Sequence, residues 1–496
     1  MRAVTFRDLS HAVQGRPIGV MLQDDTFLRV ETDSRRVRRG DLFWALRGPN
    51  HDGHDHLAEA AERGAVACVA EQGRIESLPL PTIAVSDTRL ALVDFAAWYR
   101  TQLNTRIIGI TGSVGKTSTR HMLYSALSTK FPGTESPGNF NNEIGVPLSL
   151  LGIGTEDQFA AIELAASRSG EIADLTRLAR PEIGVITHVT PAHLATFGSL
   201  AEIARTKGEL LDYLPEHGLA VLNGDNEFVR DMACFARCNV ILVGTGDSCD
   251  MRAEHVRSEN GRMRFEVEGH EFAVQTPGTH LITSALATIA VGREFGMTSD
   301  EIAAGLWEFL PVPGRCRAVP VGEWTVIDDT YNASPASMAA ACEVLRHWQG
   351  ATRRILVTGD MLELGSDSLA YHETLGRQAA ASGIDGLISI GQYAPDVLRA
   401  ARQAGMPGGC LAQLAAGEIA DMLLDCWLEP GAVVLVKGSG HANGDHRRAD
   451  PRSRRLAHRA RDAGSPRGMT PLESVVFRAA KERPFAERKA TLLAGD

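Results

Sequence analysis

One stretch decides the fold of this chain, and it reads Ile107-Ile108-Gly109-Ile110-Thr111-Gly112-Ser113-Val114-Gly115-Lys116-Thr117-Ser118. Its apolar start predicts a buried strand, and the glycines that follow predict a tight turn before a helix. Backbone N–H groups at such a turn cradle phosphates, Lys116 neutralises their charge, and Thr117 is placed to offer its hydroxyl to Mg²⁺. The stretch therefore predicts a nucleotide site, with these expected contacts: Gly112, Ser113, Val114, Gly115, Lys116, Thr117 and Ser118.

The spacing of this loop departs from the common pattern G-x-x-x-x-G-K-[ST], because Ile110 stands where that pattern has its first glycine. Gly112 lies inside the loop instead. The alternative interpretation is a glycine turn that merely begins a helix. The strand before the turn and the pair Lys116-Thr117 after it favour nucleotide binding.

Outward from the loop, short apolar runs alternate with helix-like segments. Buried strands are expected at residues 107–110, 159–164, 183–187 and 220–223. This alternation predicts a mostly parallel sheet with helices packed against it. After the turn Pro311-Val312-Pro313-Gly314 the pattern resumes, with strands expected at residues 324–327, 354–358 and 432–437.

At 496 residues, the chain has the length of about three domains of ordinary size. We expect an α/β protein with a small N-terminal domain at residues 1–84 and a central domain at residues 85–313 that carries the phosphate loop. A Rossmann-like α/β domain is expected at residues 314–496. Residues 440–466 are rich in Arg and His and poor in apolar residues, which predicts a solvated insertion in this last domain.

Composition and charge exclude several classes of protein. A chain that is 44% hydrophobic and 23% charged is typical of a globular protein rather than a disordered one. The net charge of −10 argues against a nucleic-acid binder, which usually carries a basic surface. The N-terminal residues lack an apolar signal segment, and the sequence has no apolar run of about 18 residues. We therefore expect a cytoplasmic protein without stable membrane insertion.

The form T-G-x-x-G-K-T-[ST], which Thr111 to Ser118 fits, resembles the phosphate loop of the Mur ligase family. The resemblance extends through nearly all of the chain. Thr32-Asp33-Ser34-Arg35-Arg36-Val37 is similar to the UDP-binding part of the later Mur ligases, and Pro313-Gly314-Arg315 with residues 327–338 is similar to their interdomain signature. The resemblance implies ATP-dependent formation of an amide bond through an acyl phosphate.

A second set of residues resembles one branch of that family, the branch that adds D-alanyl-D-alanine. Residues 359–365 read G-D-M-L-E-L-G and are followed by His372, whereas the motif D-N-P-R of the diamino-acid-adding branch does not occur. The resemblance implies UDP-N-acetylmuramoyl-tripeptide and D-alanyl-D-alanine as substrates, with ATP and Mg²⁺. We expect the protein to act as a monomer.

The resemblance also implies roles for individual residues. Arg315 would approach the γ-phosphate, and Asp329 would hold or orient the nucleotide. The substrate-binding residues would be Asp33, Ser34, Arg35 and Asn332. The arginine and the aspartate lie beyond the turn at residues 311–314 yet must reach the nucleotide, so we expect ligand binding to swing the third domain toward the phosphate loop.

The expected metal ligands are Thr117, Glu163, His193 and Lys207. Glu163 supplies hard oxygen atoms, whereas His193 alone would more often be structural, and Lys207 alone would be read as an exposed helical lysine. The resemblance implies Mg²⁺ ligands at Glu163 and His193 and a carbamate on Lys207, which requires a lowered lysine pKa. With these assignments, the catalytic set is Lys116, Lys207, His193 and Arg315.

Other functions compete with this interpretation. A diamino-acid-adding Mur ligase or a folylpolyglutamate-type relative would share the ATP chemistry, although Asp33-Ser34-Arg35 and Tyr331-Asn332-Ala333 argue against the folate relative. A noncatalytic nucleotide-binding protein is the alternative from another class. The joint presence of the expected phosphate, metal and nucleotide ligands favours an active ligase.

Two places depart from the family's pattern. Leu281 and Ser284 stand where the family usually has asparagines near the adenine. The family's run K-G-S-R-G-M is divided here, with Lys437-Gly438-Ser439 separated from Arg467-Gly468-Met469 by the basic segment.

Deleting residues 440–466 is expected to leave ATP-dependent ligation largely intact, because the deletion rejoins the two parts of that run. Removing a long surface loop changes the entropy of loop closure only modestly. The check is a thermal unfolding curve together with saturation curves for ATP, the UDP-linked tripeptide and the dipeptide. A large loss of stability or of apparent affinity would show that the segment is more than peripheral.

Overall fold

The structure is a computed structural model, and it describes residues 1–20, 24–74, 79–191, 197–259, 261–414, 419, 423 and 427–439. The chain forms two compact units. The first contains the described residues of Met1–Val189, Ala201–Asp250 and Ala287–Gly305, and the second those of Thr190–Leu200, Met251–Leu286 and Leu306–Asp496. The expected His193 and the segment 440–466 lie outside the described residues.

The N-terminal part of the first unit is built on a small sheet in the order β2-β7-β6-β5-β4. The strands are β2 Arg16–Ile18, β4 Val30–Glu31, β5 Leu42–Trp44, β6 Ala67–Glu71 and β7 Thr82–Val85. All neighbours are parallel except β2 and β7. Helix α3 (Thr88–Arg100) begins where Asp87 accepts hydrogen bonds from two backbone N–H groups, and its Phe95 stacks on Trp44.

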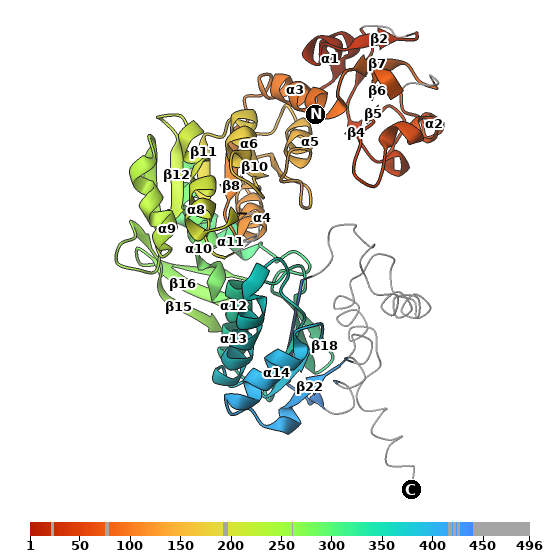
Figure 1. The fold of residues 1–496 in the computed structure, drawn as a ribbon. Helices are drawn as coiled ribbons and strands as arrows, with labels where there is room; N and C mark the ends of the chain where they lie inside the picture. The colour runs from red at the N-terminus through yellow and green to blue at the C-terminus, as the bar shows by residue number, and fades with distance from the viewer. Residues whose placement is uncertain are drawn as a thin grey trace. The chain divides into compact units, whose positions relative to one another are not determined.

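The larger sheet of the first unit carries the phosphate loop. Its order there is β13-β12-β11-β8-β10-β9, and all of these neighbours are parallel. The strands are β8 Arg106–Thr111, β9 Gly133–Glu135, β10 Phe159–Glu163, β11 Ile183–Ile186, β12 Leu219–Asn223 and β13 Asn239–Gly244. Figure 1 shows β8 in the middle of this sheet, so the loop that follows β8 lies between the ends of two neighbouring strands.

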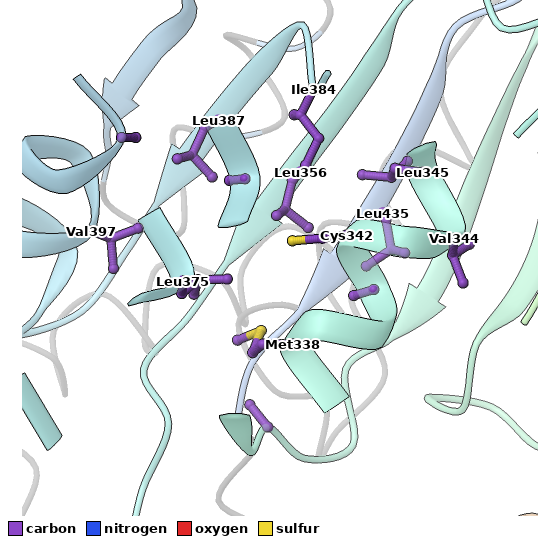
Figure 2. Packing of buried hydrophobic residues seen from close by; sticks show 14 of the residues in the cluster. Met338, Cys342, Val344, Leu345, Leu356, Leu375, Ile384, Leu387, Val397 and Leu435 are labelled. Atoms are coloured by element: carbon purple, nitrogen blue, oxygen red, sulfur yellow. The ribbon is translucent and has the colours of Figure 1, made fainter. Parts of the chain in front are cut away.

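The second unit contains a sheet in the order β18-β19-β23-β20-β21-β22, of which only the β18–β19 pair is antiparallel. The strands are β18 Arg317–Val321, β19 Trp324–Asp329, β20 Arg354–Thr358, β21 Gly386–Ser389, β22 Leu411–Gln413 and β23 Val433–Lys437. Side chains of the covering helices, such as Met338 and Leu375, pack on the sheet residues Leu356, Leu387 and Leu435 (Figure 2). This apolar layer fixes the carboxyl ends of β19 and β23 beside each other.

The remaining strands and α-helices of the described residues complete the two units. A separate antiparallel sheet consists of β15 Glu254–Glu259, β16 Arg262–Val267 and β17 His270–Val274. The other strands are β1 Val4–Thr5, β3 Thr26–Phe27 and β14 Met251–Arg252. The helices besides α3 are α1 Phe6–Ala12, α2 Leu57–Glu62, α4 Lys116–Leu127, α5 Gly145–Leu151, α6 Glu171–Ala179, α8 Leu200–Gly208, α9 Glu227–Asp231, α10 Ile282–Glu294, α11 Ser299–Trp307, α12 Pro335–Arg346, α13 Ser368–Ala381 and α14 Ala394–Gln403.

The expected α/β class, the mostly parallel central sheet and the later Rossmann-like sheet are confirmed. The domain limits at residues 84 and 313 stay predictions. In the part of the chain that is described, every helix is too short or too polar to cross a membrane.

Arg100 joins the N-terminal part of the first unit to the central sheet's helices. Its guanidinium is buried and donates hydrogen bonds to the carbonyls of Ala179 (2.8 Å) and Arg180 (3.2 Å) at the end of α6, and to that of Leu103 (3.2 Å). A cation at the carboxyl end of a helix is favourable, and the three carbonyls are satisfied by one side chain.

Arg100→Met is therefore expected to lower the free energy of unfolding by about 3 kcal/mol, because buried carbonyls lose a charged donor. The matched control is Arg177→Met on α6, which loses an exposed ion pair with Asp174 and a cation–π contact with Tyr213, each of which contributes little at a solvent-exposed position. Urea unfolding monitored by circular dichroism measures both variants. Equal stability of the two would contradict the role assigned to Arg100.

Candidate functional site

The phosphate loop begins at the carboxyl end of β8 and requires glycine at two positions. Gly112 has a φ of 144°, and a Cβ there would overlap Thr187 Oγ1. Gly115 has a φ of 88° and immediately precedes α4. Both conformations are strained for residues with a side chain. The glycines thus let the backbone lie against β11 and turn sharply into the helix.

Lys116 is the first residue of α4, and its ammonium group is held over the loop. Nζ donates hydrogen bonds to the carbonyl oxygens of Gly112 (2.7 Å) and Ser113 (3.3 Å). A lysine in this position places a positive charge beside the backbone N–H groups at the start of the helix. The combination is suited to the phosphates of a nucleotide.

Glu163 ends β10 beside the loop, as the sequence predicts. Its carboxylate accepts hydrogen bonds from Thr117 Oγ1 (3.0 Å) and from Asn141 Nδ2 (2.9 Å), and its side chain is almost fully buried. Hydroxyl and carboxylate oxygens are the ligands that Mg²⁺ prefers, so Thr117 and Glu163 fit this ion. Among the described residues, His, Cys, Asp and Glu do not gather in threes at a metal-sized site.

Asn141 is a site residue that the sequence interpretation missed. It belongs to the run G-N-F-N-N at residues 138–142, which follows β9. The buried Arg120 of α4 holds this run in place by donating to the carbonyls of Ser136 and Gly138. Three asparagines within four residues after a strand were the available signal, because such a run neither continues a strand nor favours a helix.

Lys207, near the end of α8, is buried with 4% of its surface exposed. The interpretation of this residue as an ordinary exposed lysine is therefore wrong. Burial, together with the positive charge of Lys116, lowers the pKa of Lys207 to about 7, although Glu209 and Glu171 oppose the shift. At neutral pH a large fraction of such an amine is uncharged, which is the state that reacts with CO₂.

Asp33, Ser34 and Arg35 lie together in one turn of the N-terminal part. Arg35 donates two side-chain hydrogen bonds to the carboxylate of Asp33 (2.8 and 2.7 Å), which lowers the pKa of that carboxyl. Ser34 is buried and donates to Glu59 Oε2 (2.7 Å). Arg35 is the exposed member of the three, with its guanidinium oriented by Asp33.

In the second unit, three expected residues gather at the carboxyl ends of β19 and β23. The guanidinium of Arg315 stacks 3.8 Å from the ring centroid of Tyr331. Lys437 Nζ donates to Asp329 Oδ2 (2.6 Å) and to the carbonyl of Asn332 (3.0 Å). Lys437 is fully buried, so it fixes the aspartate and the asparagine together.

The expected residues thus form three groups. Lys116, Thr117 and Glu163 meet at the phosphate loop. Lys207 belongs to the same group, because the charge of Lys116 contributes, after burial, to its lowered pKa. The turn of Asp33 to Arg35 forms a second group in the same unit, and the third group comprises Arg315, Asp329 and Asn332 in the other unit. Leu281 and Ser284, at the departures from the family pattern, are both buried.

Comparisons with known proteins agree over most of the chain. Three family models match: "Mur ligase family, catalytic domain" at residues 27–100, "Mur ligase middle domain" at residues 110–292, and "Mur ligase, glutamate ligase domain" at residues 314–440. Among curated relatives, the UDP-N-acetylmuramoyl-tripeptide–D-alanyl-D-alanine ligase of Escherichia coli (strain K12) is 38% identical over 79% of this chain and 87% of its own length. The protein of the same name from Mycobacterium tuberculosis (strain H37Rv) is 34% identical, covering 89% and 96%.

Solved structures give the same result. MurF from Acinetobacter baumannii superposes with a TM-score of 0.79 at 29% identity, over 88% of this chain and 96% of that one. MurF ligase from Thermotoga maritima in complex with ADP has a TM-score of 0.72 at 30% identity, over 83% and 94%. On sequence and fold together, this chain belongs to the Mur ligase family.

Proposed function

We propose that this chain is the ATP-dependent ligase that joins D-alanyl-D-alanine to UDP-N-acetylmuramoyl-tripeptide in the synthesis of peptidoglycan precursors. One observation carries the proposal: in the phosphate loop, Thr117 donates a hydrogen bond to Glu163, and the buried Lys207 lies near this loop. The relatives of 38% and 34% identity bear the name of this activity and match over most of their length. A noncatalytic relative would not need a buried lysine of lowered pKa, whose burial is costly.

The reaction we propose has two steps. The terminal carboxylate of the tripeptide attacks the γ-phosphorus of ATP, which forms an acyl phosphate and releases ADP. The amine of D-alanyl-D-alanine then attacks the activated carbonyl, phosphate leaves with the C–O bonding electrons, and the amine loses its proton. The carboxylate and ATP are both anionic, so the main task of the protein is to place them together and to offset their repulsion.

The chain's residues divide this task. Gly112 to Ser118 hold the phosphates through backbone N–H groups, while Lys116 and Arg315 offset charge on the transferred group and Asp329 orients the nucleotide. Mg²⁺, held by Thr117, Glu163 and His193 with a carbamylated Lys207 nearby, would supply further screening of the phosphate charge when bound. Asp33, Ser34, Arg35 and Asn332 would bind the other substrates.

The organisation that we propose for this function keeps the three domains at residues 1–84, 85–313 and 314–496, in a monomer. The proposed compartment is the cytoplasm, where ATP and UDP-linked precursors are available.

A phosphate-release assay tests the assignment of the acceptor. With ATP, Mg²⁺ and the UDP-linked tripeptide, the full chain is expected to release phosphate when D-alanyl-D-alanine is added, and far less with D-alanine or with diaminopimelate. Lys116→Ala is the control for chemistry at this loop, and it is expected to lower kcat by at least about a hundredfold through lost charge stabilisation. Release that depends on a single amino acid would instead assign the chain to another ligation step.

Lys207→Ala is expected to be inactive and to regain part of its activity with added acetate or formate, because a small carboxylate can replace the oxygens of a carbamate. Arg205→Ala is the matched control, since Arg205 lies on the same helix, is exposed and pairs with Glu202. Its activity is expected to stay near that of the unmodified chain.

The lowered pKa gives this prediction a pH dependence. The neutral fraction of Lys207 falls as pH drops below about 7, so enzyme depleted of CO₂ should recover more slowly at acid pH than at alkaline pH when the concentration of dissolved CO₂ is held constant. Full activity of Lys207→Ala without any additive would show that no carbamate is needed.

A further inference from the structure

The two residues that follow β11 hold the phosphate loop from one side by hydrogen bonds. Thr187 donates its backbone N–H to the carbonyl of Thr111 (3.0 Å) and its hydroxyl to the carbonyl of Val114 (2.6 Å). In the other direction, Ser113 N–H donates to the carbonyl of His188 (2.6 Å). The position of the His188 peptide therefore determines where the middle of the loop lies.

The ring of His188 anchors that peptide to the next strand and helix. Nδ1 lies 3.0 Å from the amide nitrogen of Asn223, which ends β12, and Nε2 lies 3.5 Å from the amide nitrogen of Asn226, which caps α9. All of these residues belong to the first unit. Neither Thr187 nor His188 was among the residues that the sequence interpretation selected.

The orientation of both amides is determined by their other hydrogen bonds. Asn223 Oδ1 accepts from the backbone N–H of Asp225 (3.0 Å), so its NH₂ group faces the ring. Asn226 Oδ1 accepts from Val229 N–H (3.1 Å), and its NH₂ group donates to the carbonyl of Val189 (3.1 Å) and also faces the ring. Nδ1 must then be an unprotonated acceptor, and the ring proton lies on Nε2, at the longer contact.

We infer that His188 is a positioning residue for the nucleotide. Its neutral imidazole accepts a hydrogen bond from Asn223, and this holds in place the His188 carbonyl that accepts from Ser113 N–H. The loop is thereby kept in the shape that binds ATP. This inference deepens the proposed function, and it rests on ATP binding at this loop. The ring acts through its own backbone and does not need to contact the substrate.

Protonation of His188 would break this arrangement, because it would turn Nδ1–H toward the NH₂ group of Asn223. Burial lowers the pKa of His188, against the attraction of Asp225 in the turn between β12 and α9. The carboxylate of Asp225 is itself bound by the N–H groups of Thr245 (2.7 Å) and Gly246 (2.8 Å). The neutral form is thus favoured at neutral pH, and its support of the loop is lost as pH falls below the usual histidine range.

A pair of shape-matched variants tests the inference. In His188→Asn the side-chain oxygen can stand where Nδ1 stands and accept from Asn223, and it does not titrate. His188→Leu has the same branching without an acceptor. At about pH 8 the KM for ATP of His188→Leu is expected to be about tenfold higher than that of His188→Asn, which is the loss of one buried hydrogen bond. The kcat values should agree within about twofold, and the KM values for the tripeptide and the dipeptide should not change.

The pH dependence separates positioning from a purely structural role. As pH is lowered from about 8 to about 5, the KM for ATP of the unmodified chain is expected to rise relative to that of His188→Asn, with the rise concentrated below the usual histidine range. Ionisation of ATP affects both enzymes equally and cancels in the ratio. Equal KM values for the Asn and Leu variants, or a ratio that stays constant with pH, would overturn the inference.

Direct binding distinguishes this failure from failure of the proposed function. Calorimetric titration with ATP and Mg²⁺ at the same pH values reports on the loop whatever the acceptor is. Thermal unfolding of both variants verifies that they are folded. If the chain binds ATP with the expected dependence on residue 188 but does not ligate the dipeptide, only the proposed function fails. If it ligates the dipeptide without that dependence, only the role of His188 fails.

Discussion

The close approach of β8 and β11 is the constraint on which the site depends. At Gly112 the loop backbone lies directly against Thr187 and His188, with no room for a Cβ. The strand order β11-β8-β10 then places the end of β11 on one side of the loop and Glu163 of β10 on the other. A parallel sheet brings the carboxyl ends of its strands to one edge, so residues far apart in the sequence surround one phosphate loop.

Electrostatics follows from this geometry. Lys116 is held over the loop, and its charge contributes to the low pKa of the buried Lys207. An uncharged lysine reduces the positive charge of the site, and a carbamate would reverse it. The same group can therefore be buried without the full cost of an unpaired ammonium ion, and as a carbamate it would supply negative charge suited to metal ions. Burial lowers the pKa of the lysine, and a lysine of low pKa can form the carbamate that would bind metal ions.

Much of the fold was predictable because the local patterns are strong. Strand Arg354–Thr358 has the bounds that the sequence indicates, since a short apolar run rich in β-branched residues leaves few alternatives. The antiparallel sheet of residues 254–274 was missed, although Met263, Phe265 and Val267 alternate with charged residues and are buried. A short strand with many charged residues resembles a loop in sequence unless the alternation of its apolar and charged residues is examined.

Local motifs alone predicted only the contiguous part of the site, whereas the more distant residues were expected from the family resemblance. Gly112 to Ser118 form a continuous motif, whereas the contact of Asn141 with Glu163 depends on how the strands are ordered. Burial of Lys207 is a property of tertiary packing, and its helix of polar and apolar residues carries no local sign of it. The role of His188 depends on two asparagines from a later strand and helix. Such contacts are long-range, so no window of sequence contains them.

The second unit shows how a carboxylate at a strand end is kept in one conformation. Asp329 is held by Lys437 from the neighbouring strand and by the backbone N–H of Cys316 (3.1 Å). A buried ion pair of this kind contributes little net stability, because desolvation of both charges offsets their attraction. Its effect is on geometry: the same lysine also binds the carbonyl of Asn332, and Tyr331 between them stacks on Arg315. Removing the lysine would therefore release the aspartate, the asparagine and the arginine together. Lys437 thus determines how the strand end presents its polar groups.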